Sequence, residues 1–398
     1  MFTGKKAHRA AVRLPMMILM LVILASGTAS SQSPGVTDTE ILLGQSCALI
    51  GPHQLLGQGM RDGALTYFRH VNEAGGINGR KIRLISMDDG YEPNACIVNT
   101  TKLIDGEKVF LLFGYTGAIT AEAAAPIAIE KKIPFFSPAT GAQFLRIPEN
   151  RYVFTTRPGY LQEIEALIEK LISEKGIGKI AVFYQNDDYG KARLETVRRI
   201  LAPKNLQIIS EAPYERNTNA VAAAGRDLLA SKPEAVIMIG TYAPCARLIS
   251  MMKNWGSDAL FATTSFVDAD TLGRQLSNRG LGVIISQVVP YPYDRRVPLV
   301  AEYHRLSGKF SPGVETGFIG LEGFLAAKAL CLIIKSMEGD MTRENFIKAA
   351  EGQAGIDLGG VKLSFNPQQH QGITDVFFTQ VVPGGFIKPL EHLKDLYN

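Results

Sequence analysis

Two segments rich in hydroxyl-bearing residues and glycine offer the clearest binding chemistry in the 398-residue sequence. Residues 114–120 (GYTGAIT) follow a predicted strand and open a helix, so free backbone N–H groups would face any anion bound there. Residues 137–142 (SPATGA) follow the next strand and add the Thr140 hydroxyl beside Gly141, where a ligand can approach the backbone closely. Together they predict a carboxylate cradle, although ordinary turn and capping chemistry also favours Ser, Thr and Gly at such positions.

Two tyrosines occupy equivalent places after strands in the second half of the chain. Tyr189 lies in residues 184–190 (YQNDDYG) and Tyr242 in residues 240–244 (GTYAP). A tyrosine can close over the apolar body of a ligand while its hydroxyl keeps a hydrogen bond. Packing is the other role of a tyrosine at a helix entrance, and the sequence leaves both roles open.

Signatures of catalysis are missing from the sequence. It contains no GxxxxGK[ST] phosphate loop, no HExxH, no GxSxG elbow and no Cys/His set with metal-ligand spacing. The histidines after residue 31 stand singly and are expected on the surface or in the core: His53, His70, His304, His370 and His392. We therefore expect no catalytic residue, no metal and no cofactor, and an NAD-dependent or hydrolytic enzyme is the least favoured class.

The elements that must position these residues alternate along the chain. Short β-branched runs separated by amphipathic stretches predict an α/β fold with parallel sheets covered by helices on both faces. Helices are expected over residues 59–74 and 161–175, each stopped by glycine. Strands are expected at residues 41–49, 82–87, 109–113, 134–136, 180–184, 207–211, 235–240, 260–263 and 283–288.

The second half of the chain repeats the pattern of the first. A strand, a polar turn and a helix follow one another in residues 82–106 and again in residues 180–201. Two similar α/β lobes are the simplest interpretation. The expected crossings between the lobes are irregular or contain proline: residues 155–159, 288–292 and 365–372.

Three crossings make each lobe discontinuous in the sequence. We expect two doubly wound, Rossmann-like lobes with these boundaries: residues 36–157 and 289–366 in the first lobe, and residues 158–288 and 367–398 in the second. Two β-rich runs flank Pro383-Gly384-Gly385, which predicts a C-terminal hairpin of residues 376–382 and 386–389.

Residues 1–31 have the three parts of a secretory signal peptide. Basic residues without any acidic residue precede the apolar run 14–25, and small residues fill 26–31. The apolar run is short for a bilayer span, which disfavours an uncleaved membrane anchor. Cleavage could follow Ala29 or Ser31, and neither boundary carries a Cys. We therefore expect a periplasmic protein with no lipid anchor and no stable membrane insertion after cleavage.

The net charge supports this division of the chain. The formal charge of +4 reflects 42 Lys and Arg against 38 Asp and Glu, and the signal segment holds four of the basic residues: Lys5, Lys6, Arg9 and Arg13. Without them the two signs balance. No basic field remains to attract nucleic acid or an anionic membrane, so we expect no nucleic-acid partner.

Four cysteines follow the signal segment: Cys47, Cys96, Cys245 and Cys331. Cys47 lies near the end of the first strand and Cys96 a few residues past the second, and these strands are neighbours in a doubly wound sheet. A disulfide between Cys47 and Cys96 is one interpretation, and four small buried thiols are the other.

Six short segments follow one another in a distinctive order: residues 41–52 (ILLGQSCALIGP), 75–80 (GGINGR), 88–93 (DDGYEP), 133–138 (IPFFSP), 188–190 (DYG) and 321–323 (LEG). Each segment alone is a weak signal. Their order and spacing resemble the leucine/isoleucine/valine-binding group of solute-binding proteins of ABC transporters. The resemblance covers essentially the whole chain after the signal segment.

The resemblance implies a type I periplasmic binding fold whose two lobes close over a small ligand by a hinge motion. The ligand contacts of the family map, position by position, onto Leu56, Thr116, Ala118, Thr140, Gly141, Tyr189, Tyr242, Ser265 and Phe318.

Three of these positions depart from the binders of branched-chain amino acids. Ala118 replaces a serine that faces the ligand carboxylate, Leu56 replaces a tyrosine, and Ser265 replaces an acidic residue that faces the α-ammonium. A buried α-ammonium without charged or dipolar partners is costly. Either Asp187 or Asp188 takes over that role, or the ligand is an uncharged or carboxylated molecule other than a free α-amino acid.

The function implied by the resemblance is that of a non-enzymatic receptor. It would capture a small organic solute, either amino-acid-like or a carboxylate or amide compound, and hand it to the ABC permease and ATPase subunits in the inner membrane. The alternative is a ligand-sensing module of the same fold that feeds a membrane sensor or regulator.

Overall fold

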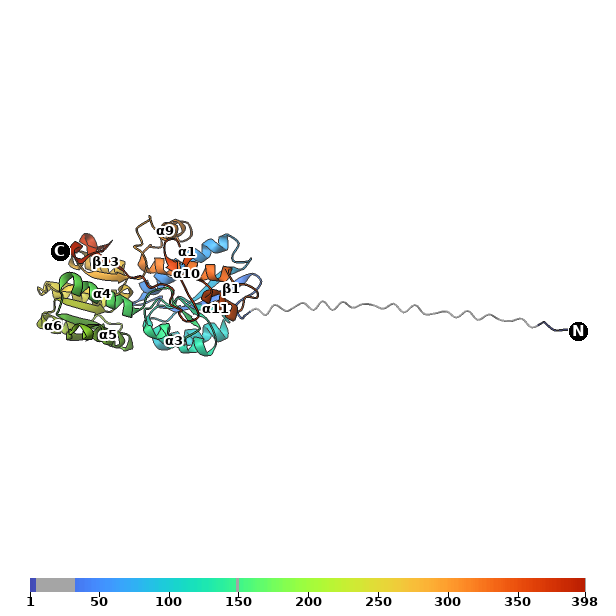
Figure 1. Cartoon of the computed structure of the whole chain (residues 1–398), viewed down its shortest axis with the longest axis horizontal. Helices are drawn as coiled ribbons and strands as arrows, with labels where there is room; N and C mark the ends of the chain where they lie inside the picture. The colour runs from blue at the N-terminus through green and yellow to red at the C-terminus, as the bar shows by residue number, and fades with distance from the viewer. Residues whose placement is uncertain (5–32, 148–149, 398) are drawn as a thin grey trace. The chain divides into compact units, whose positions relative to one another are not determined.

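The fold lies in the unit Gln32–Asn398 of a computed structural model that describes residues 1–4, 33–147 and 150–397 (Figure 1). The predicted signal peptide falls in a separate unit, Met1–Ser31, and its residues 5–31, with both proposed cleavage positions, lie outside the described residues. The signal peptide therefore stays a prediction.

Five parallel strands form the first sheet, in the order β2-β1-β3-β4-β5. The central strands β1 and β3 are buried along nearly their whole length, as expected for a parallel sheet covered on both faces. The strands are β1 (Glu40–Cys47), β2 (Lys81–Asp88), β3 (Leu111–Phe113), β4 (Phe135–Phe136) and β5 (Val153–Phe154). Strand β4 was predicted from the sequence and β5 was not, although each has two residues.

Seven strands form the second sheet, in the order β14-β13-β10-β9-β8-β6-β7. Strand β13 joins the parallel part of the sheet antiparallel to β10 and pairs with β14, which confirms the C-terminal hairpin. The strands are β6 (Ile180–Gln185), β7 (Ile208–Tyr214), β8 (Ala235–Ile239), β9 (Leu260–Thr263), β10 (Ile284–Gln287), β13 (Phe377–Val382) and β14 (Phe386–Pro389). Strand β7 runs three residues beyond its predicted end.

Helices fill the connections between strands. Helices α1 and α10 lie next to each other (Figure 1) and approach very closely, because a Cβ at Gly63 would lie 1.9 Å from the carbonyl oxygen of Gly320. Helix α4 ends at Gly176 with a left-handed φ of 65°, as the sequence predicts. The helices are α1 (Gln54–Glu73), α2 (Pro93–Thr101), α3 (Ala118–Glu130), α4 (Tyr160–Lys175), α5 (Asp188–Leu201), α6 (Ala222–Ser231), α7 (Tyr242–Asn254), α8 (Ala269–Leu276), α9 (Pro298–Phe310), α10 (Phe318–Lys335) and α11 (Arg343–Glu351).

The chain passes between the two sheets three times. It leaves the first sheet after β5, returns after β10 to form α9 and α10 against α1, and leaves again between the short strand β12 (Lys362–Leu363) and β13. The α/β class with two sheets and a C-terminal hairpin is confirmed. The residue boundaries of the two lobes stay a prediction.

The proposed disulfide is absent from the structure, which leaves Cys47 and Cys96 as free, buried thiols. Successive residues of a strand point to opposite faces of the sheet. The Cys47 thiol contacts Gly57 O of α1, whereas the preceding residue, Ser46, accepts a hydrogen bond from Asn99 of α2. Cys96 lies on α2 and contacts Thr120 O at 3.3 Å. The two thiols therefore belong to opposite faces of the first sheet, and the interpretation as buried thiols fits.

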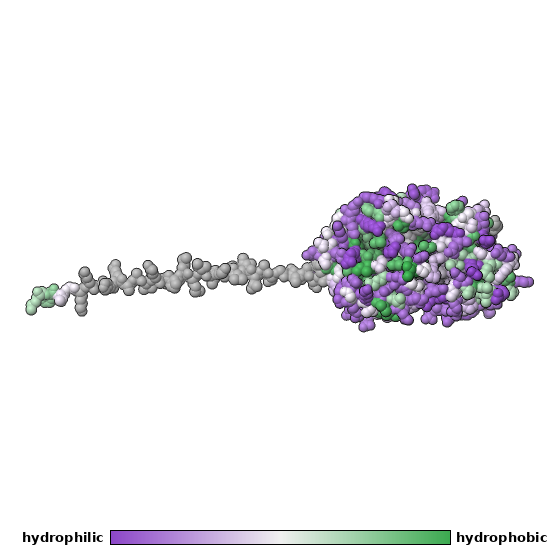
Figure 2. Space-filling view, turned by 180° about the vertical axis from the view of Figure 1, so that it is seen from behind, coloured by the Kyte–Doolittle hydropathy of each residue, from purple (hydrophilic) through white to green (hydrophobic). Residues whose placement is uncertain are grey.

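On the face drawn in Figure 2, apolar residues gather in patches within a largely hydrophilic surface. Among the described residues, no helix is both long enough and apolar enough to cross a membrane.

Candidate ligand-binding site

The two segments of the predicted cradle lie side by side beyond β3 and β4. Thr116 and Ala139 form a parallel bridge, and the Ala139 amide donates to Tyr115 O at 2.7 Å. Helix α3 begins at Ala118, directly after Gly117, which has a φ of 108° and faces the Tyr91 ring. A Cβ at Gly117 would lie 2.3 Å from that ring, so glycine is needed for both its conformation and its size. No side chain at the N-cap position, Gly117, accepts a hydrogen bond from the start of α3. The first N–H groups of α3 are therefore free for another acceptor.

The two cradle hydroxyls have different surroundings. Thr116 is 3% exposed, and its Oγ1 has no hydrogen-bond partner among the described residues. Thr140 Oγ1 instead accepts from the Ala142 amide at 3.2 Å, which is the turn chemistry that the sequence left open. Gly141 lies against Tyr160, because a Cβ there would be 2.5 Å from the Tyr160 nitrogen. The geometry thus favours Thr116 and the start of α3 as the part of the cradle that is free for a ligand.

Four aromatic rings meet beside the cradle, and we call Tyr91, Tyr160, Tyr189 and Phe266 the aromatic cluster. Tyr91 follows β2 of the first sheet, whereas Tyr189 and Phe266 follow β6 and β9 of the second. The ring centroids lie 5.6 Å apart for Tyr189–Phe266, 5.8 Å for Tyr160–Tyr189, 6.0 Å for Tyr91–Phe266 and 6.5 Å for Tyr160–Phe266. The cluster therefore joins strand ends of both sheets, where open α/β sheets place their ligands.

The hydroxyl groups of the aromatic cluster are buried and make no hydrogen bond within 3.5 Å among the described residues. Burial raises the pKa of Tyr91, Tyr160 and Tyr189 above its ordinary value, so all three phenols stay protonated and can donate. Gln185 lies near enough to Tyr91, and Thr140 near enough to Tyr160, to oppose in part the effect of burial on the pKa of each phenol. An unsatisfied buried polar group costs about 1–3 kcal/mol. Together with Thr116, the cluster presents four such groups, and a ligand that accepts their hydrogen bonds would remove that cost.

Tyr91 is held in an unfavourable backbone conformation. Its φ is 63°, in the left-handed region that bulky residues seldom adopt, and its amide donates to Asp89 Oδ1 at 2.9 Å. Asp89 also accepts from Ser46 at 2.8 Å, and burial raises the pKa of Asp89 to about 6. Strained residues of this kind concentrate at binding sites.

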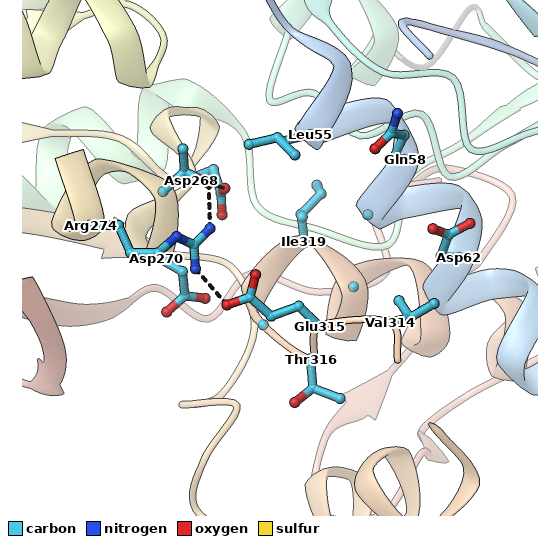
Figure 3. Close-up of a pocket in the computed structure, with 14 residues that line it drawn as sticks. Leu55, Gln58, Asp62, Asp268, Asp270, Arg274, Val314, Glu315, Thr316 and Ile319 are labelled. Atoms are coloured by element: carbon cyan, nitrogen blue, oxygen red, sulfur yellow. Dashed lines mark hydrogen bonds and ion pairs between the residues drawn. The ribbon is translucent and has the colours of Figure 1, made fainter. Parts of the chain in front are cut away.

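Three other predicted contacts belong neither to the cradle nor to the aromatic cluster. Tyr242 donates its hydroxyl hydrogen to Pro52 O, ahead of α1, and burial raises its pKa to about 12. Leu56 is buried on α1, and Phe318 is buried at the start of α10 with its ring 6.2 Å from that of Tyr291. Leu56 and Phe318 adjoin a groove of about 140 Å³ that their sequence neighbours Leu55 and Ile319 line (Figure 3).

The groove in Figure 3 is acidic, and its polar groups are mostly paired. Arg274 contacts Glu315 at 2.6 Å, and Asp270 accepts from Tyr293 at 2.9 Å. Burial, reinforced by the neighbouring Asp268, raises the pKa of Asp270 to about 7. Asp62 and Gln58 of α1 line the opposite wall.

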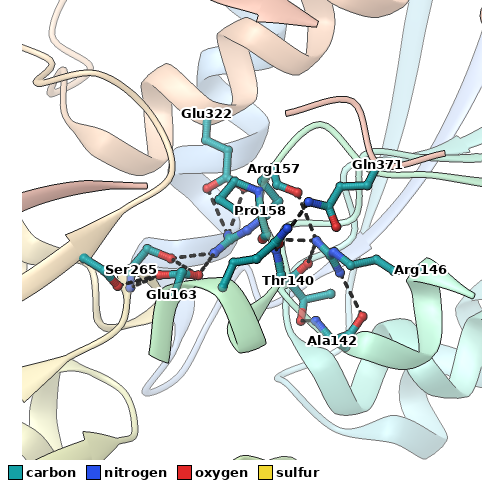
Figure 4. A network of polar contacts seen from close by, with 12 residues as sticks. Thr140, Ala142, Arg146, Arg157, Pro158, Glu163, Ser265, Glu322 and Gln371 are labelled. Carbon is teal, nitrogen blue, oxygen red and sulfur yellow. Dashed lines mark hydrogen bonds and ion pairs between the residues drawn. The ribbon is translucent and has the colours of Figure 1, made fainter. Parts of the chain in front are cut away.

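Ser265 belongs to a buried charge network formed by Arg157, Glu163, Glu322, Ser265 and Ser286 (Figure 4). Arg157 pairs at 3.0 Å with Glu163 of α4 and at 3.0 Å with Glu322 of α10. The Ser265 hydroxyl accepts from Arg157 and donates to Glu163 at 3.1 Å. Ser265 is therefore held by protein groups, and its role as a ligand contact stays a prediction.

Of the two aspartates proposed to replace the missing acid, Asp188 is exposed and Asp187 is held by protein groups. Asp187 caps α5 by accepting from the Gly190 amide at 3.1 Å, and it also accepts from the Gln185 side chain at 2.6 Å. Asp187 is thus already satisfied, which favours a ligand without an α-ammonium.

Four residues of this region were not predicted from the sequence: Tyr91, Tyr160, Phe266 and Arg193. Tyr91 stands inside the segment DDGYEP that carries part of the family resemblance, so a signal was available. Tyr160 follows a predicted crossing and Phe266 directly follows Ser265, and neither has a motif of its own. Arg193 lies over the rings of Tyr160 and Tyr189 and lacks any sequence signal.

Comparison with known proteins places this geometry in a family. Residues 40–385 match the family model described as periplasmic binding protein. An amino acid binding protein of Pseudomonas aeruginosa is 24% identical over 238 residues, which cover 58% of this chain and 62% of that protein. A Leu/Ile/Val-binding protein homolog of Brucella abortus is 25% identical over 54% of this chain and 56% of its own length. The chain thus spans less than two thirds of the length of these curated relatives.

Solved structures match over a larger part of the chain. A possible leucine/isoleucine/valine-binding protein from Rhodopirellula baltica has 32% sequence identity and a TM-score of 0.84, covering 91% of this chain and 98% of that one. A branched chain amino acid ABC transporter protein from Thermus thermophilus with bound valine, at 20% identity, shares the fold with a TM-score of 0.80 over 90% and 97% of the two chains. The chain therefore belongs to the periplasmic binding protein family, among solute-binding proteins of the leucine/isoleucine/valine-binding type.

Proposed function

We propose that the protein is the extracytoplasmic receptor of an ABC importer, which captures a small organic solute between its two lobes and delivers it to the permease and ATPase subunits. One observation carries the proposal: the rings of Tyr91, Tyr160 and Tyr189 meet, directly or through Phe266, beyond strand ends of both sheets, and their buried hydroxyls have no partners among the described residues. A ligand that bonds to both sides would stabilise the closed arrangement relative to the open one.

Contacts across the mouth of the site support hinge closure. Arg216, which follows β7, pairs with Glu92 at 2.9 Å and donates to Tyr91 O at 3.2 Å. Tyr242 reaches Pro52 in the same way from the start of α7. The Arg216–Glu92 pair is partly exposed to solvent, so opening the lobes would break it at small cost.

Native mass spectrometry of the protein purified under non-denaturing conditions tests the proposal. We expect a bound small molecule of a few hundred daltons that raises the unfolding temperature of the stripped protein when it is added back. A protein that carries no small molecule, and that no component of a rich growth medium stabilises, would contradict the proposal. Co-purification with permease and ATPase subunits, as opposed to a membrane sensor, would separate uptake from sensing.

A further inference from the structure

Arg193 is a buried cation inside the aromatic cluster. It lies on α5 four residues after Tyr189, so both side chains share one face of the helix. Its guanidinium carbon lies 4.5 Å from the centre of the Tyr160 ring and 4.7 Å from that of Tyr189, and the residue is 4% exposed. Cation–π contacts hold the guanidinium plane in place and leave its charge without neutralisation.

Arg193 has no carboxylate partner in the described part of the chain. Its guanidinium makes one hydrogen bond there, to the carbonyl oxygen of Tyr189 at 3.0 Å. Glu122 of α3 is close enough for Arg193 to lower its pKa against the larger effect of burial, but the two form no ion pair. Arg157 in the charge network shows the ordinary arrangement, with two carboxylates at 3.0 Å. A buried guanidinium without a counter-ion is costly, so a negative group is missing beside Arg193.

The surroundings of Arg193 are rich in donors. The unpaired hydroxyls of Tyr91, Tyr160 and Tyr189 belong to the same cluster of rings. Tyr160 also links Arg193 to the cradle, because the Tyr160 amide donates to Gly141 O at 2.8 Å. A carboxylate suits this arrangement, since it accepts two parallel hydrogen bonds from a guanidinium and further bonds from hydroxyls. An α-ammonium would add donors and a like charge beside Arg193.

We propose that the ligand is an organic acid without an α-ammonium group and that its carboxylate pairs with Arg193, while its apolar body packs against the rings of Tyr189 and Phe266. This inference rests on the proposed function, because it names the ligand class of the same site. It also accounts for Ser265, which faces the charge network in place of an acidic residue that would hold an ammonium.

Matched pairs of compounds test the ligand class. The purified protein is incubated with an equimolar mixture of about thirty carboxylic acids and the primary amides or α-amino acids that share their carbon skeletons, including 4-methyl-2-oxopentanoate with leucine and benzoate with benzamide. Native mass spectrometry then identifies the retained compounds. We expect retention of acids alone, with the best acid binding at least about 30-fold more tightly than its matched partner in calorimetric titration.

Substitutions then test Arg193 itself. Arg193→Gln should weaken binding of the best acid about 30-fold or more, and Arg193→Lys should weaken it less, because lysine keeps the charge but loses the planar fork. Arg199→Gln removes the same charge from the exposed face of α5 and should leave the affinity unchanged. Thermal unfolding without ligand shows whether each variant is folded. The preference of the unaltered protein for acids over amides is measured independently, so it tests the ligand class even if a variant fails to fold.

The outcomes separate this inference from the proposed function. Retention of amides or amino acids, or equal affinity of the Arg193→Gln variant and the unaltered protein for the best acid, would overturn the inference and leave a solute receptor. If the protein retained no acid, amide or amino acid from the mixture and no compound from yeast extract, both the inference and the proposed function would be overturned.

Discussion

The charge network and the aromatic cluster are both buried and polar, yet they differ in whether their polar groups have partners within the protein. In the charge network, Arg157 meets Glu163 and Glu322, and the hydroxyls of Ser265 and Ser286 complete the remaining bonds of Glu163. In the aromatic cluster, three tyrosine hydroxyls have no partner among the described residues, and Arg193 has no carboxylate.

The difference indicates two kinds of function. Apart from Arg157 Nε, the polar side-chain atoms of the charge network all have partners among the described residues. Such a network is rigid, and Arg157 lies at the first passage of the chain between the sheets, where it ties α4 to α10. An unsatisfied cluster is complete only when another molecule supplies the missing acceptors. We therefore interpret the charge network as the support of the hinge and the aromatic cluster as the binding site.

The largest expected effect comes from breaking the charge network. Arg157→Ala leaves Glu163 and Glu322 buried without a counter-ion, so the free energy of unfolding should fall by about 3–5 kcal/mol. Urea unfolding followed by circular dichroism measures this. Arg151→Ala is the control, because Arg151 pairs with Glu344 at the surface and should cost at most about 1 kcal/mol. An equal fall in the free energy of unfolding in the two variants would show that the charge network stabilises the fold no more than a surface ion pair does.

The groove of Figure 3 contains a half-buried carboxylate, that of Asp270, which forms no ion pair among the described residues. Burial and Asp268 raise the pKa of Asp270 to about 7, so the folded protein binds this proton more tightly than the unfolded chain does. The stabilising contribution of Asp270 is present at about pH 4 and is lost as the pH rises to about 7.

Asp270→Asn should flatten this pH dependence. We expect the variant to be more stable than the unaltered protein by about 1–2 kcal/mol at pH 8 and by less at pH 5, as measured by urea unfolding at both values. Asp227→Asn, on the exposed face of α6, should give the same difference at both pH values. The proposed effect of Asp270 on stability would be contradicted if the Asp270→Asn variant and the unaltered protein lost the same stability between pH 5 and pH 8.

Removing one tyrosine hydroxyl at a time tests whether that hydroxyl has a partner in the ligand-free protein. Tyr189→Phe removes an unpaired hydroxyl, so the ligand-free protein should keep its stability or gain up to about 1 kcal/mol, while ligand affinity falls about tenfold. Tyr214→Phe is the matched control, because its buried hydroxyl donates to Gln185 at 3.1 Å and its loss should cost about 1 kcal/mol. Thermal unfolding and calorimetric titration give both quantities, and a clear loss of ligand-free stability in Tyr189→Phe would mean that its hydroxyl is paired.

The smallest effect concerns the cysteines. Because Cys47 and Cys96 face opposite sides of the first sheet, a reducing agent should leave the unfolding temperature unchanged. A native disulfide typically contributes about 2–4 kcal/mol, so a drop of several degrees on reduction would show that the bridge forms after all.

Local chemistry made much of the fold predictable from the sequence. Three kinds of feature each depend on a few neighbouring residues: buried strands such as β1 and β8, the glycine stop at Gly176 and the hairpin around Pro383-Gly384-Gly385. Strand β5 was not predicted, although β4, which is equally short, was.

The site was predictable only in part, because its properties depend on partners that are distant in the sequence. The sequence placed Thr116 and Tyr189 at strand ends, but it could not show that their hydroxyls lack partners whereas Thr140 finds one in Ala142. Ser265 has the expected position after β9, yet its role is decided by Glu163, about a hundred residues earlier. Whether a buried polar group is satisfied is a property of the assembled fold.

A crystal structure of the protein purified with its own ligand tests the central claim most directly. We expect ligand oxygen atoms within about 3.2 Å of the hydroxyls of Tyr91, Tyr160, Tyr189 or Thr116, between the two sheets. A ligand bound in the groove of Figure 3, with those four hydroxyls still unpaired, would contradict the assignment of the aromatic cluster as the binding site.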